Sequence, residues 1–250
     1  MKKWKQALFI TLIIMGVLVA FAVVIGILNA TVLDGAINFG WNNYRYDATG
    51  FTVGEGSVFD TSITAIELDW RAGDVRIEVC EDDFISVSEH SAELLTDVTR
   101  VHWKAESGTL TIKTRESGWF FGSDVEKSLT LRIPEKMFDQ LASLAVESGN
   151  GNVVLSGIGA QSITVNSRDG DVKMSLSQTP LSMNVTAKDG QVTMQLPRDA
   201  SFALEWTKNE GFLVSNFHGV NAENAYVVGD GASKFYVATD EGDLIVDFAP

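Results

Sequence analysis

Apolar and polar side chains alternate along most of the chain from about residue 63 onward. Ile66, Leu68 and Trp70 alternate with Glu67 and Asp69. Successive side chains of a β-strand point to opposite faces, so this period of two predicts strands with one buried face. The alternation recurs at 75–79, 129–133, 163–165, 172–176, 181–185, 192–196, 202–206 and 244–248. We therefore predict an all-β domain over residues 61–250.

A glycine-containing motif recurs between these strands, as SGNGNVVL (148–155), SRDGDVKM (167–174), AKDGQVTM (187–194) and TDEGDLIV (239–246). A fixed period of about 20 residues indicates stacked repeats, each too small to bury its apolar face alone. The pattern predicts a β-solenoid with two-strand rungs; a β-sandwich of hairpins is the alternative, but does not require equal spacing. The predicted repeat turns contain Gly151, Gly170, Gly190, Gly211 and Gly242.

Two segments depart from this pattern. Residues 135–144, after Pro134, are predicted to form a helical turn or two. The segment 109–115 and the segment 126–133 resemble the two arms of a hairpin, with the sequence GWFFG (118–122) between them. Trp119, Phe120 and Phe121 are therefore expected at a loop tip, where they either fold back onto the domain or contact a partner.

The N-terminal region has a different character. Residues 7–30 are almost wholly apolar and carry no charge, and Lys2, Lys3 and Lys5 precede them. About 20 apolar residues span a bilayer, and basic residues favour the cytoplasmic side. We predict a cytoplasmic tail at 1–6, a transmembrane signal-anchor at 7–30 that contacts the lipid bilayer, and an extracytoplasmic C-terminal domain. A cleaved signal peptide is the alternative, although the stretch is long and its cleavage site poor.

Residues 31–60 mix glycine, asparagine and aromatic residues without periodicity, and are predicted to be a juxtamembrane linker. Trp41, Tyr44 and Tyr46 either lie at the membrane interface or cap the first strands, and the second placement is favoured. A single cysteine, Cys80, excludes an intrachain disulfide.

The chain is acidic, with a formal net charge of −14. Since Lys2, Lys3 and Lys5 precede the apolar segment, the rest of the chain carries 16 of the 19 Lys and Arg residues and all 33 Asp and Glu residues. Such a surface repels nucleic acid, and nucleic acid is excluded as a partner. It suits a soluble domain outside the cell membrane.

The run LRIPEKMFDQLASLAVESGNGNVVLSGIGAQSITVNSRDGDVKM (131–174) resembles the DUF4097 family of adhesin-like and LiaG-like envelope proteins of Gram-positive bacteria. The resemblance rests on a strand that ends at Ile133 and Pro134, followed by the turns at Gly151 and Gly170, and covers about residues 63–250. It implies a β-solenoid-like fold behind one membrane helix. The family supplies no catalytic residues.

Acidic residues recur at the repeat turns. Asp169, Asp171, Asp189 and Asp243 would form a column along one edge of a solenoid, and carboxylates with turn carbonyls can bind Ca²⁺. Calcium-binding β-rolls use nine-residue repeats, however, so ordinary turn chemistry is the favoured interpretation. No cofactor is predicted, and the sequence contains no nucleophile, metal-ligand or phosphate-loop motif, so an enzyme is not expected.

These patterns predict a non-catalytic, membrane-anchored cell-envelope protein. Its β-repeat domain would be a surface for binding, adhesion or scaffolding, with a protein or an envelope polymer as ligand. The alternative is an accessory regulator or sensor of envelope stress that acts through a membrane partner. The oligomeric state is not indicated by any pattern.

Overall fold

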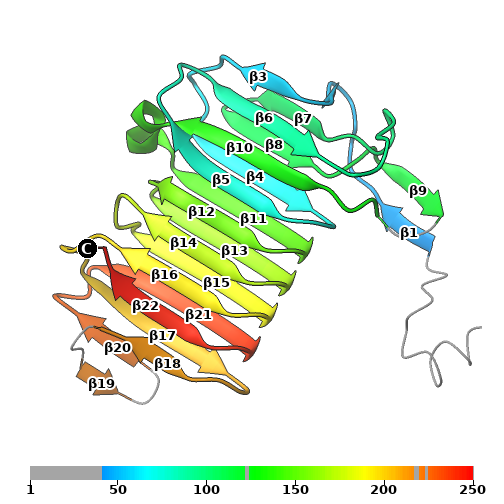
Figure 1. Ribbon diagram of the computed structural model, residues 1–250. Coiled ribbons are helices and arrows are strands. Elements are labelled where there is room, and N and C mark those ends of the chain that lie inside the picture. Colours follow the sequence, from blue (N-terminus) through cyan, green and yellow to red (C-terminus); the bar gives the residue numbers. More distant parts are fainter. Residues whose placement is uncertain (1–40, 122–123, 217–219, 223–224, 250) are drawn as a thin grey trace, which may run out of the picture. The chain divides into compact units, whose positions relative to one another are not determined.

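The computed structural model describes residues 41–121, 124–216, 220–222 and 225–249, with the backbone alone for 41–43, 119–121 and 220–222. Most described residues belong to two facing β-sheets (Figure 1). The first has nine strands, in the order β18 (Leu213–Ser215), β22 (Leu244–Phe248), β16 (Val192–Leu196), β14 (Val172–Leu176), β12 (Val153–Ile158), β5 (Val75–Cys80), β10 (Ser128–Pro134), β6 (Ile85–His90) and β3 (Gly56–Val58).

The second sheet has eleven strands. Their order is β19 (Val220–Ala222), β20 (Ala225–Val228), β17 (Phe202–Lys208), β21 (Ser233–Glu241), β15 (Ser182–Asp189), β13 (Ser162–Asp169), β11 (Ser143–Asn150), β4 (Ala65–Trp70), β8 (Thr109–Lys113), β7 (His102–Glu106) and β2 (Thr52–Val53). A separate unit contains β1 (Trp41–Tyr44), which pairs antiparallel with β9 (Gly118–Phe121).

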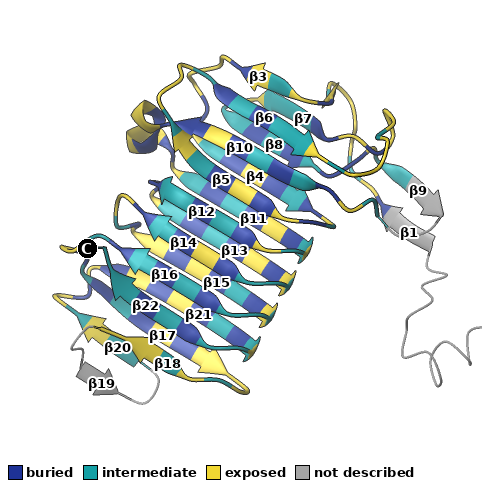
Figure 2. Cartoon of the chain, viewed as in Figure 1, coloured by how far each residue is buried: buried dark blue, intermediate teal, exposed yellow. Residues whose placement is uncertain are grey.

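Each repeat contributes one strand to each sheet, joined by a glycine turn, and neighbouring repeats pair in parallel. This arrangement confirms the predicted β-solenoid with two-strand rungs. Alternate residues face the space between the sheets, as the striped colouring of Figure 2 shows. Ile163, Val165, Met183 and Val185 are buried there at equivalent positions of two adjacent rungs. The buried side chains of successive rungs form one continuous core. Each such side chain contributes roughly 1.5–3 kcal/mol on burial.

The rungs do not stack in sequence order. The C-terminal rung, β21–β22, lies between β15–β16 and β17–β18. At the opposite end, β4–β5 lies between β11–β12 and the pair β8 and β10. Beyond the outermost parallel strands, β20 and β19 on one end and β6, β3, β7 and β2 on the other add antiparallel pairings.

Three features of the fold differ from the sequence predictions. The segments 109–115 and 126–133 do not form a hairpin, because β8 and β10 belong to different sheets. Accordingly, the sequence GWFFG is not a hairpin tip; residues 118–121 form β9. Strands β2 and β3 lie within the predicted linker 31–60, so the β domain begins before residue 61. The predicted helical turn is confirmed as the 3₁₀ helix η1 (Glu135–Gln140), with Pro134 at its N-cap.

The predicted transmembrane segment 7–30 lies outside the described residues. Within the ranges that the structure describes, no helix has the length and apolar character needed to span a bilayer. The membrane anchor and the cytoplasmic tail at 1–6 stay predictions.

Candidate binding surface

The predicted repeat glycines form one column along the edge where the rungs turn. Gly151, Gly170, Gly190, Gly242 and Gly211 follow one another in that spatial order, and each has a positive φ. A Cβ atom at each would lie 2.1–2.4 Å from the carbonyl oxygen of the glycine on the preceding rung, which for Gly151 is Gly73. Glycine is therefore required both by its backbone conformation and by the close approach of the adjacent turn.

The residue after each glycine forms a second column. Where this residue is Asp or Asn, its side-chain oxygen accepts a hydrogen bond from the backbone N–H of the equivalent residue on the next rung, which explains the preference for these two residue types. The bonds run from Asn152 to Asp74 Oδ1 (2.8 Å), from Asp171 to Asn152 Oδ1 (3.0 Å), from Gln191 to Asp171 Oδ1 (3.0 Å) and from Phe212 to Asp243 Oδ1 (2.8 Å).

The residue before each glycine forms a third column. Asp169 and Asp189 stand in register, as do Asp189 and Glu241. Among the described residues, no group of three or more His, Cys, Asp or Glu side chains is placed to hold a metal ion. Calcium at Asp169, Asp171, Asp189 and Asp243 stays the less favoured alternative to ordinary turn chemistry, and the hydrogen bonds to Asp171 and Asp243 give these two residues a structural role in the turns.

This role makes a prediction for Asp171. Replacing Asp171 with Ala leaves the Gln191 N–H without its acceptor and is expected to lower the free energy of unfolding by about 1 kcal/mol, measured by urea denaturation. Asp171→Asn is the matched control, because Asn152 already accepts the same bond one rung away. Equal losses in the two variants would show that the carboxylate charge, rather than the ladder, is what matters.

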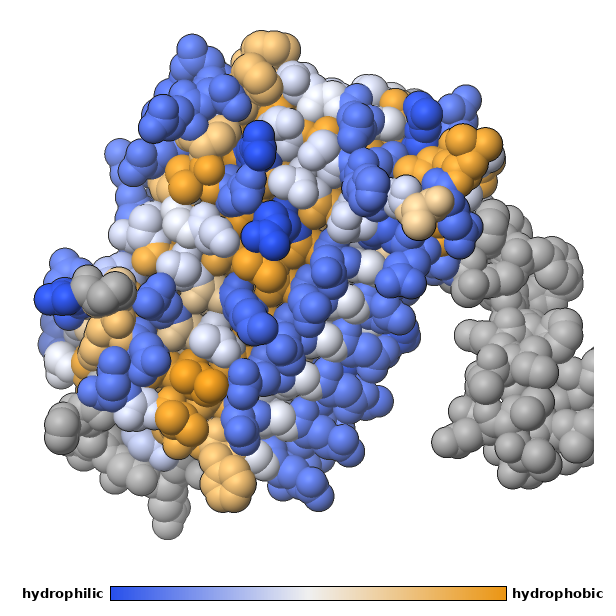
Figure 3. Space-filling view, viewed as in Figure 1, coloured by the Kyte–Doolittle hydropathy of each residue, from blue (hydrophilic) through white to orange (hydrophobic). Residues whose placement is uncertain are grey.

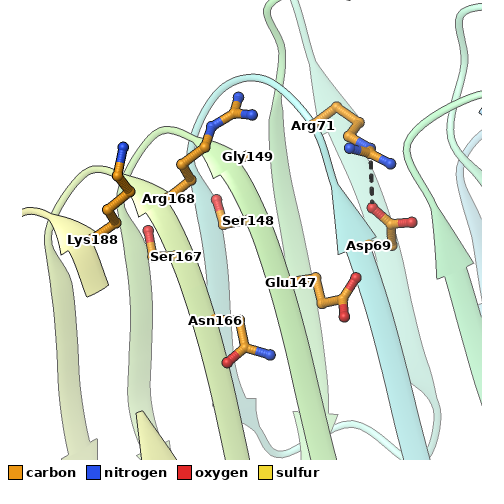
Figure 4. A pocket seen from close by; sticks show the side chains of 9 residues that line it. All are labelled: Asp69, Arg71, Glu147, Ser148, Gly149, Asn166, Ser167, Arg168 and Lys188. Carbon is orange, nitrogen blue, oxygen red and sulfur yellow. Dashed lines mark ion pairs between the residues drawn. The ribbon is translucent and has the colours of Figure 1, made fainter. Parts of the chain in front are cut away.

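A polar hollow lies beside this turn edge, on the outer face of the eleven-stranded sheet (Figure 4). It encloses about 320 Å³, at the C-terminal ends of β4, β11, β13 and β15. Gly149 explains the hollow, because it provides no side chain between Arg71 and Arg168 on the neighbouring rungs. The lining residues are Asp69, Arg71, Glu147, Ser148, Gly149, Asn166, Ser167, Arg168 and Lys188.

Two of the cations of the hollow, Arg168 and Lys188, are held only weakly. Arg168 Nε lies 3.3 Å from Asp169, and Lys188 Nζ lies 3.7 Å from Asp189. The Arg168 and Lys188 side chains are 62% and 58% exposed, so solvent screens both pairs, which contribute little to stability. These two cations can therefore exchange their partners for a ligand at little cost in folding free energy.

The floor of the hollow offers polar groups that the fold does not use. Glu147 and Asn166 stand in register on β11 and β13, both exposed. Within the part of the chain that the structure describes, neither side chain has a hydrogen-bond or ion-pair partner. Ser148 Oγ is also buried without a partner, but Ser148 alternates with Glu147, so its hydroxyl faces the core rather than the hollow. The Glu147 and Asn166 side chains are therefore the groups that a ligand on the outer face can contact.

Sequence reasoning selected residues beside the hollow but none of the residues that line it. It selected Asp169 and Asp189 but missed Arg168 and Lys188, which precede them directly, and the floor residue Glu147. The signal is the repeated order of a basic residue, Asp and Gly in SRDG and AKDG. Trp119, Phe120 and Phe121 belong to β9 rather than to this surface. Their side chains are outside the description, and their contact with a partner stays a prediction.

Comparison with solved structures finds the same fold in the crystal structure of "a putative cell adhesion protein" from Clostridium sporogenes, with a TM-score of 0.59 and 15% identity over 80% of this chain and 99% of that one. A "putative adhesin" from Bacteroides fragilis matches with a TM-score of 0.32 and 8% identity, over 80% and 98% of the two chains. Comparison with curated proteins gives no match. The Toastrack DUF4097 family matches residues 63–175 and 140–247. Together these two matches span most of the chain, which therefore belongs to the Toastrack DUF4097 family.

Proposed function

We propose that the chain is a non-catalytic, membrane-anchored protein of the cell envelope. Residues 7–30 hold it in the bilayer, and its β-repeat domain binds a ligand outside the cytoplasm, in adhesion or scaffolding. The observation that carries the proposal is the polar hollow. There Glu147 and Asn166 are exposed, and the weakly paired Arg168 and Lys188 contribute little to the stability of the fold.

The arrangement favours binding over catalysis. Asp69 is half-buried and already contacts Arg71 at 3.5 Å and Lys113 at 3.4 Å, so its carboxylate is neutralised by two cations. Glu147 lies beside it on the same flat face, open to water. Acid–base catalysis on a polymer needs two carboxyl groups on either side of the scissile bond. Two neighbours on one open face do not provide that geometry.

The ligand class follows from the repetition of the surface. Donors and acceptors recur across the strands at the inter-strand distance of about 4.8 Å. Arg168 and Lys188 can donate to hydroxyl, carboxylate or phosphate oxygens, and Glu147 can accept from hydroxyl or ammonium groups. A hydroxylated and charged envelope polymer meets both requirements. The likeness in fold to a protein described as a cell adhesion protein agrees with this proposal.

The test measures retention of the full chain, purified in detergent, on isolated Gram-positive cell-wall fragments. Wild-type protein is expected to bind, and Arg168→Ala is expected to weaken binding about tenfold, because one charge-assisted hydrogen bond contributes roughly 1.5 kcal/mol or more. Arg132→Ala is the matched control. Arg132 is also a half-exposed arginine with a carboxylate partner, Glu78, but it lies on the nine-stranded sheet.

Two outcomes would contradict the proposal. Equal weakening by Arg168→Ala and Arg132→Ala would show unspecific attraction rather than binding in the hollow. Retention of a membrane signalling protein from solubilised envelope, with no retention of wall fragments, would favour the alternative role as an accessory regulator.

A further inference from the structure

The two sheets end differently at the C-terminal end of the solenoid. In the eleven-stranded sheet, the last parallel strand β17 is followed by the antiparallel strands β20 and β19. In the nine-stranded sheet, β18 is the last strand, and no described strand pairs with its other side. Solenoids need caps because an open end exposes both the core and unpaired backbone groups.

The backbone of β18 has groups that point to this free side. Leu244 N–H donates to Phe212 O at 3.0 Å, and Leu213 stands opposite Leu244 in the parallel register. In a parallel ladder, alternate residues bond to the neighbouring strand, so Phe212 and Val214 bond to β22. The N–H and C=O groups of Leu213 and Ser215 consequently point away from β22.

Apolar side chains surround the same edge. Phe212 is 73% exposed and Val214 is 52% exposed, and Ile245 stands beside Val214 in register. Figure 3 shows apolar surface gathered over this corner, where β22 and β18 lie. Leu213 is only half-buried, whereas Leu244, its equivalent on the adjacent rung, is fully buried. The residues that the structure describes therefore leave the end of the core incompletely covered on this sheet.

The charges near the edge are mainly negative. Glu210, Asp243 and Asp247 flank the segment that contains β18. Lys208 is the basic residue nearby, and its ammonium donates to Gly211 O and lies 4.9 Å from the Trp206 ring centroid. Because these three carboxylates outnumber the single Lys208 ammonium, the field at the edge favours a cationic partner.

We propose that β18 accepts an extended segment of another protein as an additional strand. The segment has apolar side chains at alternate positions, which pack beside Phe212 and Val214, and basic residues at its ends. Backbone hydrogen bonds to Leu213 and Ser215 provide affinity, and the apolar contacts set the register, as in other cases of strand addition.

A second copy of this chain does not fit as an antiparallel partner. Two copies that pair antiparallel through β18 are related by a twofold axis normal to the sheet. The eleven-stranded sheet extends two strands, or about 10 Å, further than the nine-stranded sheet. The β19–β20 strands of the two copies would then occupy the same space.

The experiment measures binding of a labelled synthetic peptide to the full chain in detergent, by fluorescence anisotropy. The peptide alternates Val with Thr and has Lys residues at both ends. Ser215→Pro is expected to weaken binding at least tenfold, because proline removes an N–H that faces the free edge while the exposed side chain contacts no core. Leu181→Ser, at another exposed apolar residue, is expected to leave binding unchanged.

Hydrogen exchange provides a second measurement that does not depend on the proline variant. Bound peptide is expected to slow exchange of the Leu213 and Ser215 amides at least tenfold in wild-type protein. Binding with equal affinity to wild type and folded Ser215→Pro, or without protection of these amides, overturns the proposal. It is also overturned if the chain itself forms a dimer that Ser215→Pro converts to a monomer, since a second copy would then be the partner.

Discussion

Replacing Gly190 with alanine is expected to lower the free energy of unfolding by about 3 kcal/mol. Gly190 has a φ of +152°, which an alanine adopts only with strain. In addition, the new Cβ would lie 2.2 Å from the carbonyl oxygen of Gly170, a backbone atom of the adjacent rung. Strain of about 1 kcal/mol and overpacking of roughly 1–3 kcal/mol act together, because the rungs must separate to admit the methyl group.

Gly50→Ala separates these two contributions. Gly50 also has a positive φ, of +77°, but the nearest atom to its built Cβ is Lys104 Cε at 3.4 Å, on a flexible side chain. Only the backbone strain should apply, so the expected loss is about 1 kcal/mol. Both values come from urea denaturation followed by tryptophan fluorescence. Equal losses in the two variants would show that the glycine column does not limit the spacing of the rungs.

The glycine column also shows what the sequence could predict. Period-two alternation and equally spaced glycines have one physical cause, the stacking of identical rungs, so both the strands and the turn positions were predictable. The stacking order was not. Gly211 follows Gly190 in the sequence, but Gly242 lies between them in space. A rung with this alternation can stack either next to the rung of Gly190 or at the end of the solenoid. The repeat pattern therefore does not predict which rungs are neighbours.

Pairing over long sequence distances explains the other differences. The strands β8 and β10 both alternate, which identifies them as strands but not the sheet that each joins. Strands β2 and β3 contain only two and three residues, too few to show any period. In the hollow, Arg168 and Glu147 resemble any solvated charge in the sequence. Only the register of β11 and β13 places them beside Gly149 and reveals a common surface.

The buried ion pair between Lys127 and Glu89 also could not be predicted from the sequence. Lys127 Nζ lies 2.6 Å from Glu89 Oε2 and 2.5 Å from Thr99 O, and both charged side chains are at most 4% exposed. Glu89 also accepts the Val101 N–H, and the Lys127 ammonium lies 4.9 Å from the centroid of the Trp70 ring. Burial lowers the pKa of Lys127, and the hydrogen bond to Glu89 opposes that change. The charged form therefore depends on its partner.

Lys127→Met is expected to lower the free energy of unfolding by about 3–5 kcal/mol at neutral pH. The methionine fills a similar volume, but it leaves the Glu89 carboxylate buried without a cation, and an uncompensated buried charge is strongly destabilising. The surface pair of Lys136 and Asp83 provides the control, since these side chains are 52% and 88% exposed. Lys136→Met should therefore cost less than about 1 kcal/mol in the same denaturation experiment.

The double variant Lys127→Met with Glu89→Gln distinguishes loss of charge pairing from loss of packing. Glutamine keeps an oxygen that can accept the Val101 N–H and removes the unpaired charge, so the double variant should be more stable than Lys127→Met alone. If the double variant is the less stable of the two, the cost of Lys127→Met comes from lost contacts with Trp70 and Thr99 rather than from the unpaired Glu89 charge.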